Sequence, residues 1–282
     1  MRTRLFVTLW VAFSFLLGTT SCNNGGSKGH ENDIKFSSIE LEEKYHLLNN
    51  PDNPNCNLEI KFTYPSQWSD EKLLPELQRQ FVLSYFGENY EGYTPEEAAH
   101  HYVEDYIAAY KELESDFKED LSKADERPVG AWYAYYEMSE NSIDFDQQGI
   151  LSYTVSFENY TGGAHGAHAY NHHVIDLQTA KPLTEADIFV EDYEEKLAQI
   201  LVDQIAKQNN VANNKELENI GFFSIDEIFP NGNFMVDQTG ITYSFNEYEI
   251  AAYVVGVTHV QLPYKEIRHL LRDDSPISSL ID

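Results

Sequence analysis

Basic residues are scarce in this chain of 282 residues, which has 19 lysines and arginines against 47 aspartates and glutamates and a formal net charge of −28. A protein that binds nucleic acid needs a basic surface to neutralise phosphates. The charge therefore excludes nucleic acid as a partner. It favours a basic protein as the partner, because an anionic surface steers cationic proteins toward itself. The alternative is that the acidic surface serves only solubility.

Cysteine is also scarce, and long apolar runs are missing. The only cysteines are Cys22 and Cys56, which are too few for a zinc site built on cysteine. The apolar run at 5–17 is shorter than the roughly 20 residues that cross a bilayer as a helix. With 42% hydrophobic and 23% charged residues, the composition is otherwise that of a globular protein and excludes a fibrous or wholly disordered chain.

The first residues have the features of an export signal. Two arginines precede the apolar run at 5–17, and small residues at 18–21 lead directly to Cys22. A basic start, a short apolar run and a small-residue site are typical of a secretory signal peptide, and a cysteine at this place resembles a bacterial lipoprotein signal. We therefore predict a signal peptide over 1–21, lipidation of Cys22, and an exported, membrane-anchored lipoprotein of a bacterial cell envelope. The alternative is ordinary secretion with an incidental cysteine.

Residues 22–33 contain mainly asparagine, glycine, serine and charged residues, which predicts a flexible tether. The lipid on Cys22 would be the only contact with the membrane. Cys56 would then have no intrachain partner, so the fold must be stabilised by its core without a disulfide.

Hydrophobic patterning predicts both strands and helices. Alternating apolar residues, or a β-branched and aromatic composition, indicate strands, which we expect at 34–47, 58–64, 129–139, 150–158, 169–177, 234–236, 241–245 and 254–262. The strand at 58–64 should end at Pro65. Helical spacing predicts helices at 70–86, 94–121, 191–208 and 264–271. The second of these begins with a capping-box pattern at Thr94 and Glu97.

The order of these elements predicts the fold class. Strands and helices do not alternate as strand–helix–strand units, so we expect an α+β fold with mainly antiparallel sheets and packed helices. We divide it into two αβ halves, an N-terminal domain over 34–160 and a C-terminal domain over 161–275.

The densest unusual feature is the segment 160–173, which contains four of the ten histidines and two adjacent glycines. The glycines permit positive φ and so predict a hairpin turn. The turn is either purely structural, with His165 hydrogen-bonded so that it holds the loop down, or a ligand-contact loop formed by Tyr160, Thr161, Gly162, Gly163, His165 and Gly166.

A metal site is the alternative for the same segment, with His165, His168 and Asp176 as ligands. On a strand, His168 and His172 share a face but lie about 13 Å apart, at roughly 3.3 Å per residue. Zinc ligands bond the ion at about 2.0 Å, so that pair could share an ion only if the strand had a bulge.

No specific catalytic motif is present. The two glycines lack the Gly-Lys-Ser/Thr ending of a P-loop, and the sequence has no Gly-x-Ser-x-Gly elbow and no His-Glu-x-x-His. Aromatic residues make up 13% of the chain, and those at 132–136 crowd one predicted strand. Such side chains suit protein or glycan contacts, although strands favour aromatic residues in any case.

Three stretches together resemble a known family. They are Tyr160 to His165, the segment 176–189 with its Asp-Leu-x-Thr-x-Lys-x-Leu-Thr-x-x-Asp-Ile-Phe pattern, and 234–263 with Gly240, Tyr243, Phe245, Tyr248 and Gly256. The combination is similar to the RsiV-type extracellular module. That module occurs in lysozyme-sensing anti-sigma factors and beside the catalytic domain of PdaC-type peptidoglycan deacetylases, as two adjoining domains of unknown function.

The resemblance covers about residues 34–275 and implies an α+β extracytoplasmic binding module, for which lysozyme is the ligand in the anti-sigma members. It implies no catalytic residues. The sequence shows neither a sigma-binding segment behind a transmembrane helix nor the metal motif of the deacetylase domain, so neither of those activities is implied.

Two hypotheses follow for function. The first is a non-enzymatic, lipid-anchored envelope protein that needs no cofactor and binds a basic protein such as lysozyme or a cell-wall component. The second is a metal-dependent envelope hydrolase that uses the cluster His165 to His173.

Overall fold

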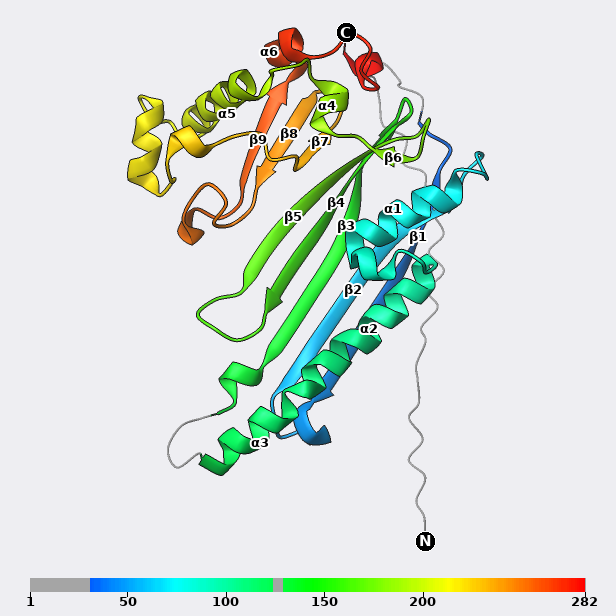
Figure 1. Ribbon diagram of the computed structural model, residues 1–282, viewed down its shortest axis with the longest axis vertical. Helices are drawn as coiled ribbons and strands as arrows, with labels where there is room; N and C mark the ends of the chain where they lie inside the picture. Colours follow the sequence, from blue (N-terminus) through cyan, green and yellow to red (C-terminus); the bar gives the residue numbers. More distant parts are fainter. Residues whose placement is uncertain (1–30, 124–128, 282) are drawn as a thin grey trace, which may run out of the picture.

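The protein folds into a long six-stranded sheet, a smaller three-stranded sheet and helices packed against both (Figure 1). The structure, a computed structural model, describes residues 31–123 and 129–281. This architecture confirms the predicted α+β class. The predicted signal peptide, Cys22 and most of the predicted tether lie outside the described residues.

The large sheet has the strand order β1-β2-β3-β4-β5-β6. Its strands are β1 (Lys35–His46), β2 (Asn55–Gln67), β3 (Tyr135–Gln147), β4 (Ile150–Tyr160), β5 (Ala167–Asp176) and β6 (Lys181–Pro182). Neighbouring strands are antiparallel except for β2 and β3, which are parallel. A parallel pair requires a long crossover connection, and here it contains α1 (Leu74–Phe86), α2 (Pro95–Glu112) and α3 (Glu114–Lys123).

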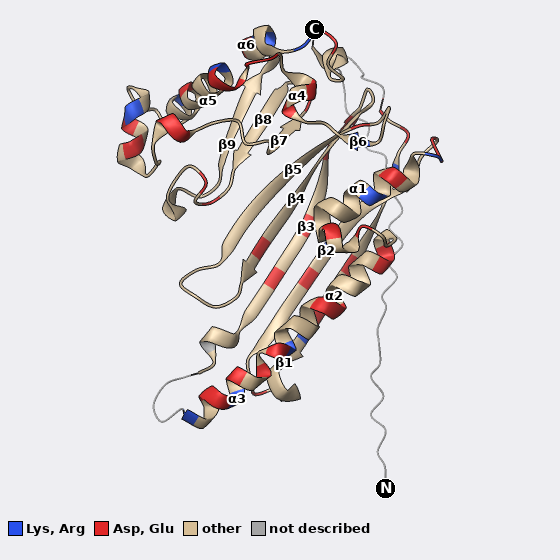
Figure 2. Cartoon of the chain, in the orientation of Figure 1, with Lys and Arg blue, Asp and Glu red and all other residues tan. Residues whose placement is uncertain are grey.

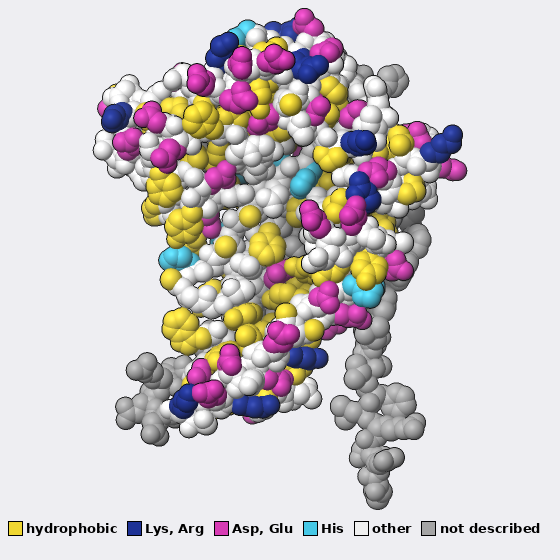
Figure 3. Space-filling model, in the orientation of Figure 1, with side chains coloured by type: hydrophobic (Ala, Val, Ile, Leu, Met, Phe, Trp, Pro, Cys, Tyr) yellow, Lys and Arg dark blue, Asp and Glu magenta, His cyan; other side chains and the backbone are white. Residues whose placement is uncertain are grey.

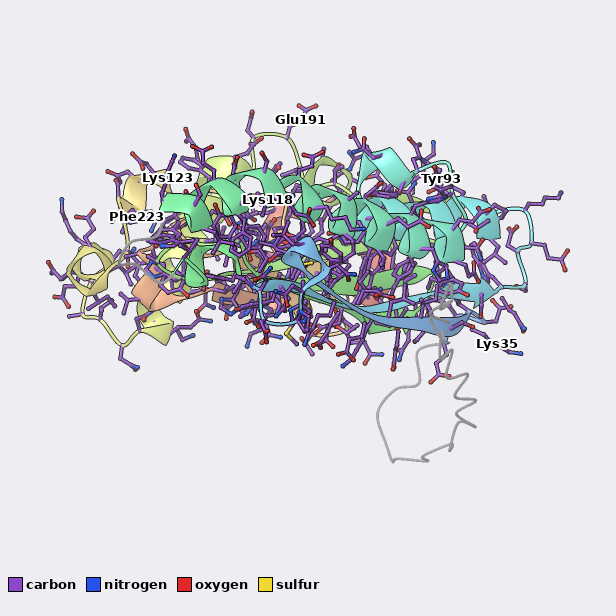
Figure 4. The ribbon with its side chains drawn as sticks, turned by 90° about the horizontal axis from the view of Figure 1, so that it is seen from below. Lys35, Tyr93, Lys118, Lys123, Glu191 and Phe223 are labelled. Atoms are coloured by element: carbon purple, nitrogen blue, oxygen red, sulfur yellow. The ribbon has the colours of Figure 1, made fainter. Side chains whose placement is uncertain are left out.

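The helices of this connection lie on one face of the large sheet, which we call the helix face (Figure 4). On this face, Leu58, Ile60 and Phe62 alternate along β2 and are almost completely buried. Phe81 of α1 stacks on Tyr153 of β4 with 4.1 Å between the ring centroids. The period of two in β2 therefore gives one face to the core and leaves the other, which we call the open face, to polar residues.

The capping box predicted at Thr94 is present. The Thr94 hydroxyl accepts a hydrogen bond from the backbone N–H of Glu97, and the Glu97 carboxylate accepts one from the backbone N–H of Thr94. Both donors would otherwise lack a partner, because the first N–H groups of a helix have none within it. The predicted helix at 94–121 is divided at Leu113 into α2 and α3.

Replacing Thr94 with alanine is expected to lower the free energy of unfolding by about 1 kcal/mol, since one capping hydrogen bond of α2 is lost. Urea denaturation of the two proteins measures this difference. Ser122→Ala is the matched control, because the Ser122 hydroxyl bonds only the carbonyl of Glu119 within its own exposed helix. An unchanged midpoint for T94A would show that the cap does not stabilise the fold.

The small sheet is antiparallel and contains β7 (Phe234–Val236), β8 (Gly240–Phe245) and β9 (Thr258–Pro263). The helix α5 (Glu194–Gln208) packs beside β9, and the short helices α4 (Glu185–Ile188) and α6 (Tyr264–Ile267) complete this part. The predicted hairpin of β7 and β8 is confirmed. A Cβ atom at Gly240 would lie 2.2 Å from the carbonyl oxygen of Leu262, so this close strand pairing requires glycine.

The small sheet packs against the open face of β4 and β5, near the end where β4 begins. Tyr153 belongs to the core of the helix face, whereas Ser152 points the other way, and its hydroxyl donates to the carbonyl of Val236 at 2.7 Å. The two strands thus contribute to both cores. The expected boundary at 160/161 falls inside one continuous sheet, because β4 and β5 pair along their whole length.

Several predicted bounds are wrong in detail. Residues 131–133 form a 3-10 turn, and β3 begins only at Tyr135; a second 3-10 turn at 253–255 precedes β9. β2 continues through Pro65, which lies next to a bulge whose extra residue is Ser66 of β2, since Lys35 pairs with Gln67 and Phe36 with Pro65. Asn32, which lies within the predicted tether, is held by the fold, because its side chain bonds Asp146 and the backbone of the β3–β4 turn.

Candidate ligand-contact site

The loop between β4 and β5 is the predicted glycine turn, and its shape requires glycine. Gly162 and Gly163 have φ values of 85° and 120°, in the region that other residues rarely adopt. A Cβ atom on Gly162 would lie 2.9 Å from the Trp132 carbonyl oxygen, and one on Gly166 would lie 2.7 Å from the Asn159 carbonyl oxygen. The loop is therefore held close against β4 and the turn at 131–133.

The same loop meets the connection between β8 and β9, which is distant in sequence. The imidazole of His165 stacks on Tyr253 with 4.5 Å between ring centroids, and Tyr253 stacks on Tyr248 at 5.7 Å. The hydroxyl of Tyr248 lies 3.5 Å from Nε2 of His165. Three rings from two loops thus form one short stack, held together by ring contact rather than by a strong hydrogen bond.

Side chains around this stack are unusually exposed. Tyr248 is 57% exposed, Val254 88% and Trp132 66%. Together with Tyr160, His165 and Tyr253 we call these residues the aromatic tip. Hydrophobic side chains gather along this edge in Figure 3. Large exposed apolar groups that cluster, rather than scatter singly, mark interaction sites.

The backbone at Tyr248 is strained. Its φ is 65°, a conformation that costs of the order of 1 kcal/mol or more for a residue with a large side chain. The connection from β8 to β9 fixes this conformation: the Glu249 carboxylate accepts from the N–H of Asn246, and the Glu249 N–H donates to the Asn246 carbonyl. The strain holds a mostly exposed ring in place, which is the kind of outlier that marks functional sites.

Carboxylates lie next to the aromatic tip. The imidazole of His168 lies between Glu158, at 3.6 Å, and Glu247, at 3.2 Å. Tyr136 donates its hydroxyl proton to Glu158 and stacks on Tyr160 with 6.2 Å between ring centroids. The site therefore combines ring faces with negative charge, and both favour cationic groups of a ligand.

Side chains from the segments just before β7 and just after β8 cap the outer edge of β5. The backbone N–H groups of His168, Tyr170 and His172 donate to the side chains of Glu247, Asn246 and Asn233 respectively. Unpaired strand edges invite pairing with other chains, and here alternate N–H groups of β5 are satisfied by side chains instead of another strand. This arrangement fixes the tip loops relative to the large sheet.

The structure does not bring the predicted metal ligands together. His165 stacks on Tyr253, and His168 lies between two glutamates, whereas Asp176 caps the turn at the other end of β5 by accepting from the N–H of Gln178. His168 and Asp176 are eight residues apart on one strand, about 26 Å at 3.3 Å per residue. Among residues 31–123 and 129–281 no three histidines, cysteines or acids are placed to hold a metal ion. The metal set His165, His168 and Asp176 is therefore wrong.

A buried chain of hydrogen bonds links the two sheets. Thr154 donates to Asp144, and its hydroxyl is 2.7 Å from Nδ1 of His172. Nε2 of His172 is 2.5 Å from the hydroxyl of Ser244, which is 2.6 Å from Nδ1 of His259. Because Thr154 has only one proton to donate, His172 must carry its proton on Nδ1 and accept from Ser244 at Nε2. Every donor in the chain then points toward Asp144.

This chain resembles a serine–histidine pair oriented by a carboxylate, but Ser244 cannot act as a nucleophile. Its side chain is 0% exposed, and the hydroxyl is already shared between two imidazoles. A nucleophile must reach a substrate. The chain is therefore a structural link between β3, β4, β5, β8 and β9.

A shallow depression of about 310 Å³ lies beside this link and is lined by residues that include Asn231, Asn233, Asn246 and Glu249. Their polar groups already bond one another or the backbone: Asn231 bonds Glu249 and the carbonyl of Ser244, and Asn233 bonds the carbonyls of Tyr170 and Ser244. They hold the fold together and leave little capacity for a ligand.

Sequence patterns found only half of the tip. The turn at 160–166 was signalled by its glycines, but the contact of His165 with Tyr248 and Tyr253 joins residues more than 80 positions apart. Within the resemblance, Tyr248 and Gly256 were the signals for that second loop. Trp132 was also not predicted as part of the tip, because the sequence placed it in a strand at 129–139, whereas it is an exposed residue of a turn.

Two family models match adjoining parts of the chain. Residues 50–168 match a family described as "Deacetylase PdaC", and residues 186–265 match "Protein of unknown function (DUF3298)". No curated protein matches the chain. These matches confirm the resemblance to two adjoining domains of the RsiV type.

Solved structures extend this result. A DUF3298 family member from Bacteroides fragilis is 34% identical, with a TM-score of 0.84, over 89% of this chain and 98% of the other. A DUF3298 family protein from Pseudomonas aeruginosa is 15% identical, with a TM-score of 0.56 over 86% of this chain and 97% of the other, and so shares the fold. The first match spans nearly all of both chains at substantial identity, and the chain therefore belongs to the DUF3298 family.

Proposed function

We propose that this protein is a non-enzymatic, lipid-anchored binding module of a bacterial cell envelope, whose aromatic tip contacts a cationic protein such as lysozyme or a cell-wall component. The observation that carries the proposal is Tyr248. A strained backbone holds its exposed ring against Tyr253 and His165. Backbone strain of this kind clusters at functional sites.

The charge of the chain supports a cationic partner. Acidic residues outnumber basic ones by 47 to 19, and Figure 2 shows acidic segments across the large sheet and on α2 and α3. Such a surface accelerates encounter with basic proteins and repels acidic ones. Ring faces beside Glu158 and Glu247 then supply short-range contacts for lysine and arginine side chains.

The position of the N-terminus fits a tip that faces away from a membrane. Glu31 forms a bridge with Gln147 at the turn between β3 and β4, whereas the aromatic tip lies at the other end of β4 (Figure 1). The 11 residues of β4 span about 36 Å. With a lipid on Cys22, the chain from 23 to 30 reaches at most about 28 Å, so the turn would lie near the membrane and the tip away from it.

The family supports an extracytoplasmic setting. The match to PdaC covers 50–168, and the RsiV-type module is an extracellular one. No helix within the described ranges is long and apolar enough to cross a bilayer.

The test is direct binding by the protein that lacks residues 1–22 and keeps every residue the structure describes. Isothermal titration with a c-type lysozyme, and co-sedimentation with purified cell-wall sacculi, measure the two ligand classes. If lysozyme binds, we expect its affinity to fall at least about tenfold between about 50 mM and about 500 mM salt, because screening weakens charge attraction. Absence of binding to both ligands would refute the proposal, and a salt-independent affinity would refute the role of charge.

A further inference from the structure

The open face of the large sheet remains uncovered over the half that leads to the aromatic tip. The small sheet packs on the open face only near the start of β4, and α1 and α2 lie on the opposite side (Figures 1 and 4). No other described element packs extensively on this part, and Glu247 of the β8–β9 connection reaches only its edge, at His168. Side chains of Glu42 and Met138 on this part are exposed. A sheet face of this size without a cover needs a physical explanation.

The register places carboxylates in one row across this face. Glu42 is directly opposite Glu59, Glu59 is beside Met138, and Met138 is opposite Glu158. Like charges directly opposite each other destabilise a sheet. Within the described residues no lysine or arginine forms an ion pair with any of these glutamates; on the neighbouring row, Lys61 pairs instead with Glu140 at 3.9 Å. Asn57 and Tyr136 donate hydrogen bonds to Glu59 and Glu158, and His168 lies 3.6 Å from Glu158. The like charges of Glu42 and Glu59 remain directly opposite each other, and a cation from outside would relieve their repulsion.

Apolar groups lie at the centre of the row. Met138 is 43% exposed, and the stacked pair Tyr136 and Tyr160 lies beside it. Protein interfaces have apolar centres rich in methionine and tyrosine, with polar groups at the rim. A flexible thioether also adapts to an incoming surface. The face thus has the composition of an interface, with acidic groups on both sides of an apolar centre.

We propose that this part of the open face is a docking surface for a lysine- and arginine-rich protein surface, centred on Met138 and continuous with the aromatic tip. The inference rests on the proposed function and extends the contact surface beyond the aromatic tip. Charge complementarity selects this occupant: a second copy of the chain would bring the same row of glutamates and be repelled. Tyr160 joins the two surfaces, because it belongs both to the tip and to the stack beside Met138.

The experiment compares charge reversals on opposite sides of the molecule. Lysozyme binding to the protein without residues 1–22 is measured by titration for E42K/E59K and for the control pair E112K/D116K. The control side chains are exposed on α2 and α3 and give the same change in net charge. We expect E42K/E59K to weaken binding at least about tenfold and the control less than about threefold. Met138→Ala, which alters no charge, should weaken binding about fivefold.

Each other outcome rejects the docking surface. Equal weakening by both pairs would mean that only the overall charge matters. No weakening by E42K/E59K, together with lost binding in a Tyr248 variant, would leave the proposed function intact and refute this inference alone. Lysozyme binding by neither the parent nor the variants would refute this inference, and the proposed function falls with it only if the parent also fails to bind sacculi. Self-association of the parent in sedimentation, lost in E42K/E59K, would identify a second copy as the occupant.

Discussion

Replacing His172 with alanine is expected to lower the free energy of unfolding by about 3 kcal/mol. The imidazole is 9% exposed and bonds Thr154 on one side and Ser244 on the other. Alanine would remove one hydrogen-bond partner from each of these hydroxyls inside the junction of the two sheets and would open a cavity there. Urea denaturation at neutral pH measures the loss.

His173 is the matched control, because it is the next residue of β5 and points to the opposite face. It stacks on Tyr153 with 5.0 Å between ring centroids, and its buried Nε2 has no hydrogen-bond partner among the described residues. Phenylalanine preserves the stacking and removes the unsatisfied nitrogen, so His173→Phe should be neutral or stabilising by up to about 1 kcal/mol. Equal losses in H172A and H173F would contradict the importance of the hydrogen-bonded chain.

The same two residues make stability depend on pH. Burial lowers the pKa of His172 and of His173 to about 4, from an ordinary value of 6.5. As pH falls below 6.5 the unfolded chain takes up protons before the folded one, so stability is full above this pH and is lost as pH falls toward 4. Between pH 6.5 and pH 4, the free energy of unfolding of H173F should therefore fall by about 2–3 kcal/mol less than that of the parent. An unchanged pH profile in H173F would show that His173 is not buried as a neutral base.

Local signals predicted most of the fold. Thr94 and Glu97 are close in sequence, so their capping box could be recognised directly, and the alternation in β2 determines which face is buried. The errors arose where packing overrides local preference. Trp132 and Tyr133 have side chains that favour strands, but the turn at 131–133 lies against the close backbone of Gly162, a contact that no local pattern reports.

The candidate site was less predictable, because long-range contacts define it. Gly162 and Gly163 signalled a turn, and that turn exists with positive φ at both. Nothing near them in sequence indicates that His165 meets Tyr253, or that Ser244 joins His172 to His259. The four histidines suggested a metal, whereas the structure uses one in a ring stack, one between glutamates and two on opposite faces of β5. Residue type alone could not distinguish these environments.

Replacing Tyr248 with glycine is expected to weaken lysozyme binding about thirtyfold, the loss of an aromatic residue at the centre of an interface, while the folded protein becomes no less stable. Glycine adopts a φ of 65° without the strain that tyrosine has there, which offsets the lost stacking on Tyr253 and the greater freedom of the unfolded chain. Binding is measured by titration and stability by urea denaturation on the same protein.

Gln148→Gly separates the two effects. Gln148 also has a positive φ, of 57°, in the turn between β3 and β4, at the end of the sheet away from the tip. This variant should relieve similar strain, since glycine populates that region freely, and leave binding unchanged.

If Y248G bound as tightly as the parent, the exposed ring would have no part in recognition. If Y248G lost both binding and more than about 2 kcal/mol of stability, the ring would support the fold, because the lost packing would then outweigh the relieved backbone strain. Binding lost at unchanged stability is the result that only a contact residue can give.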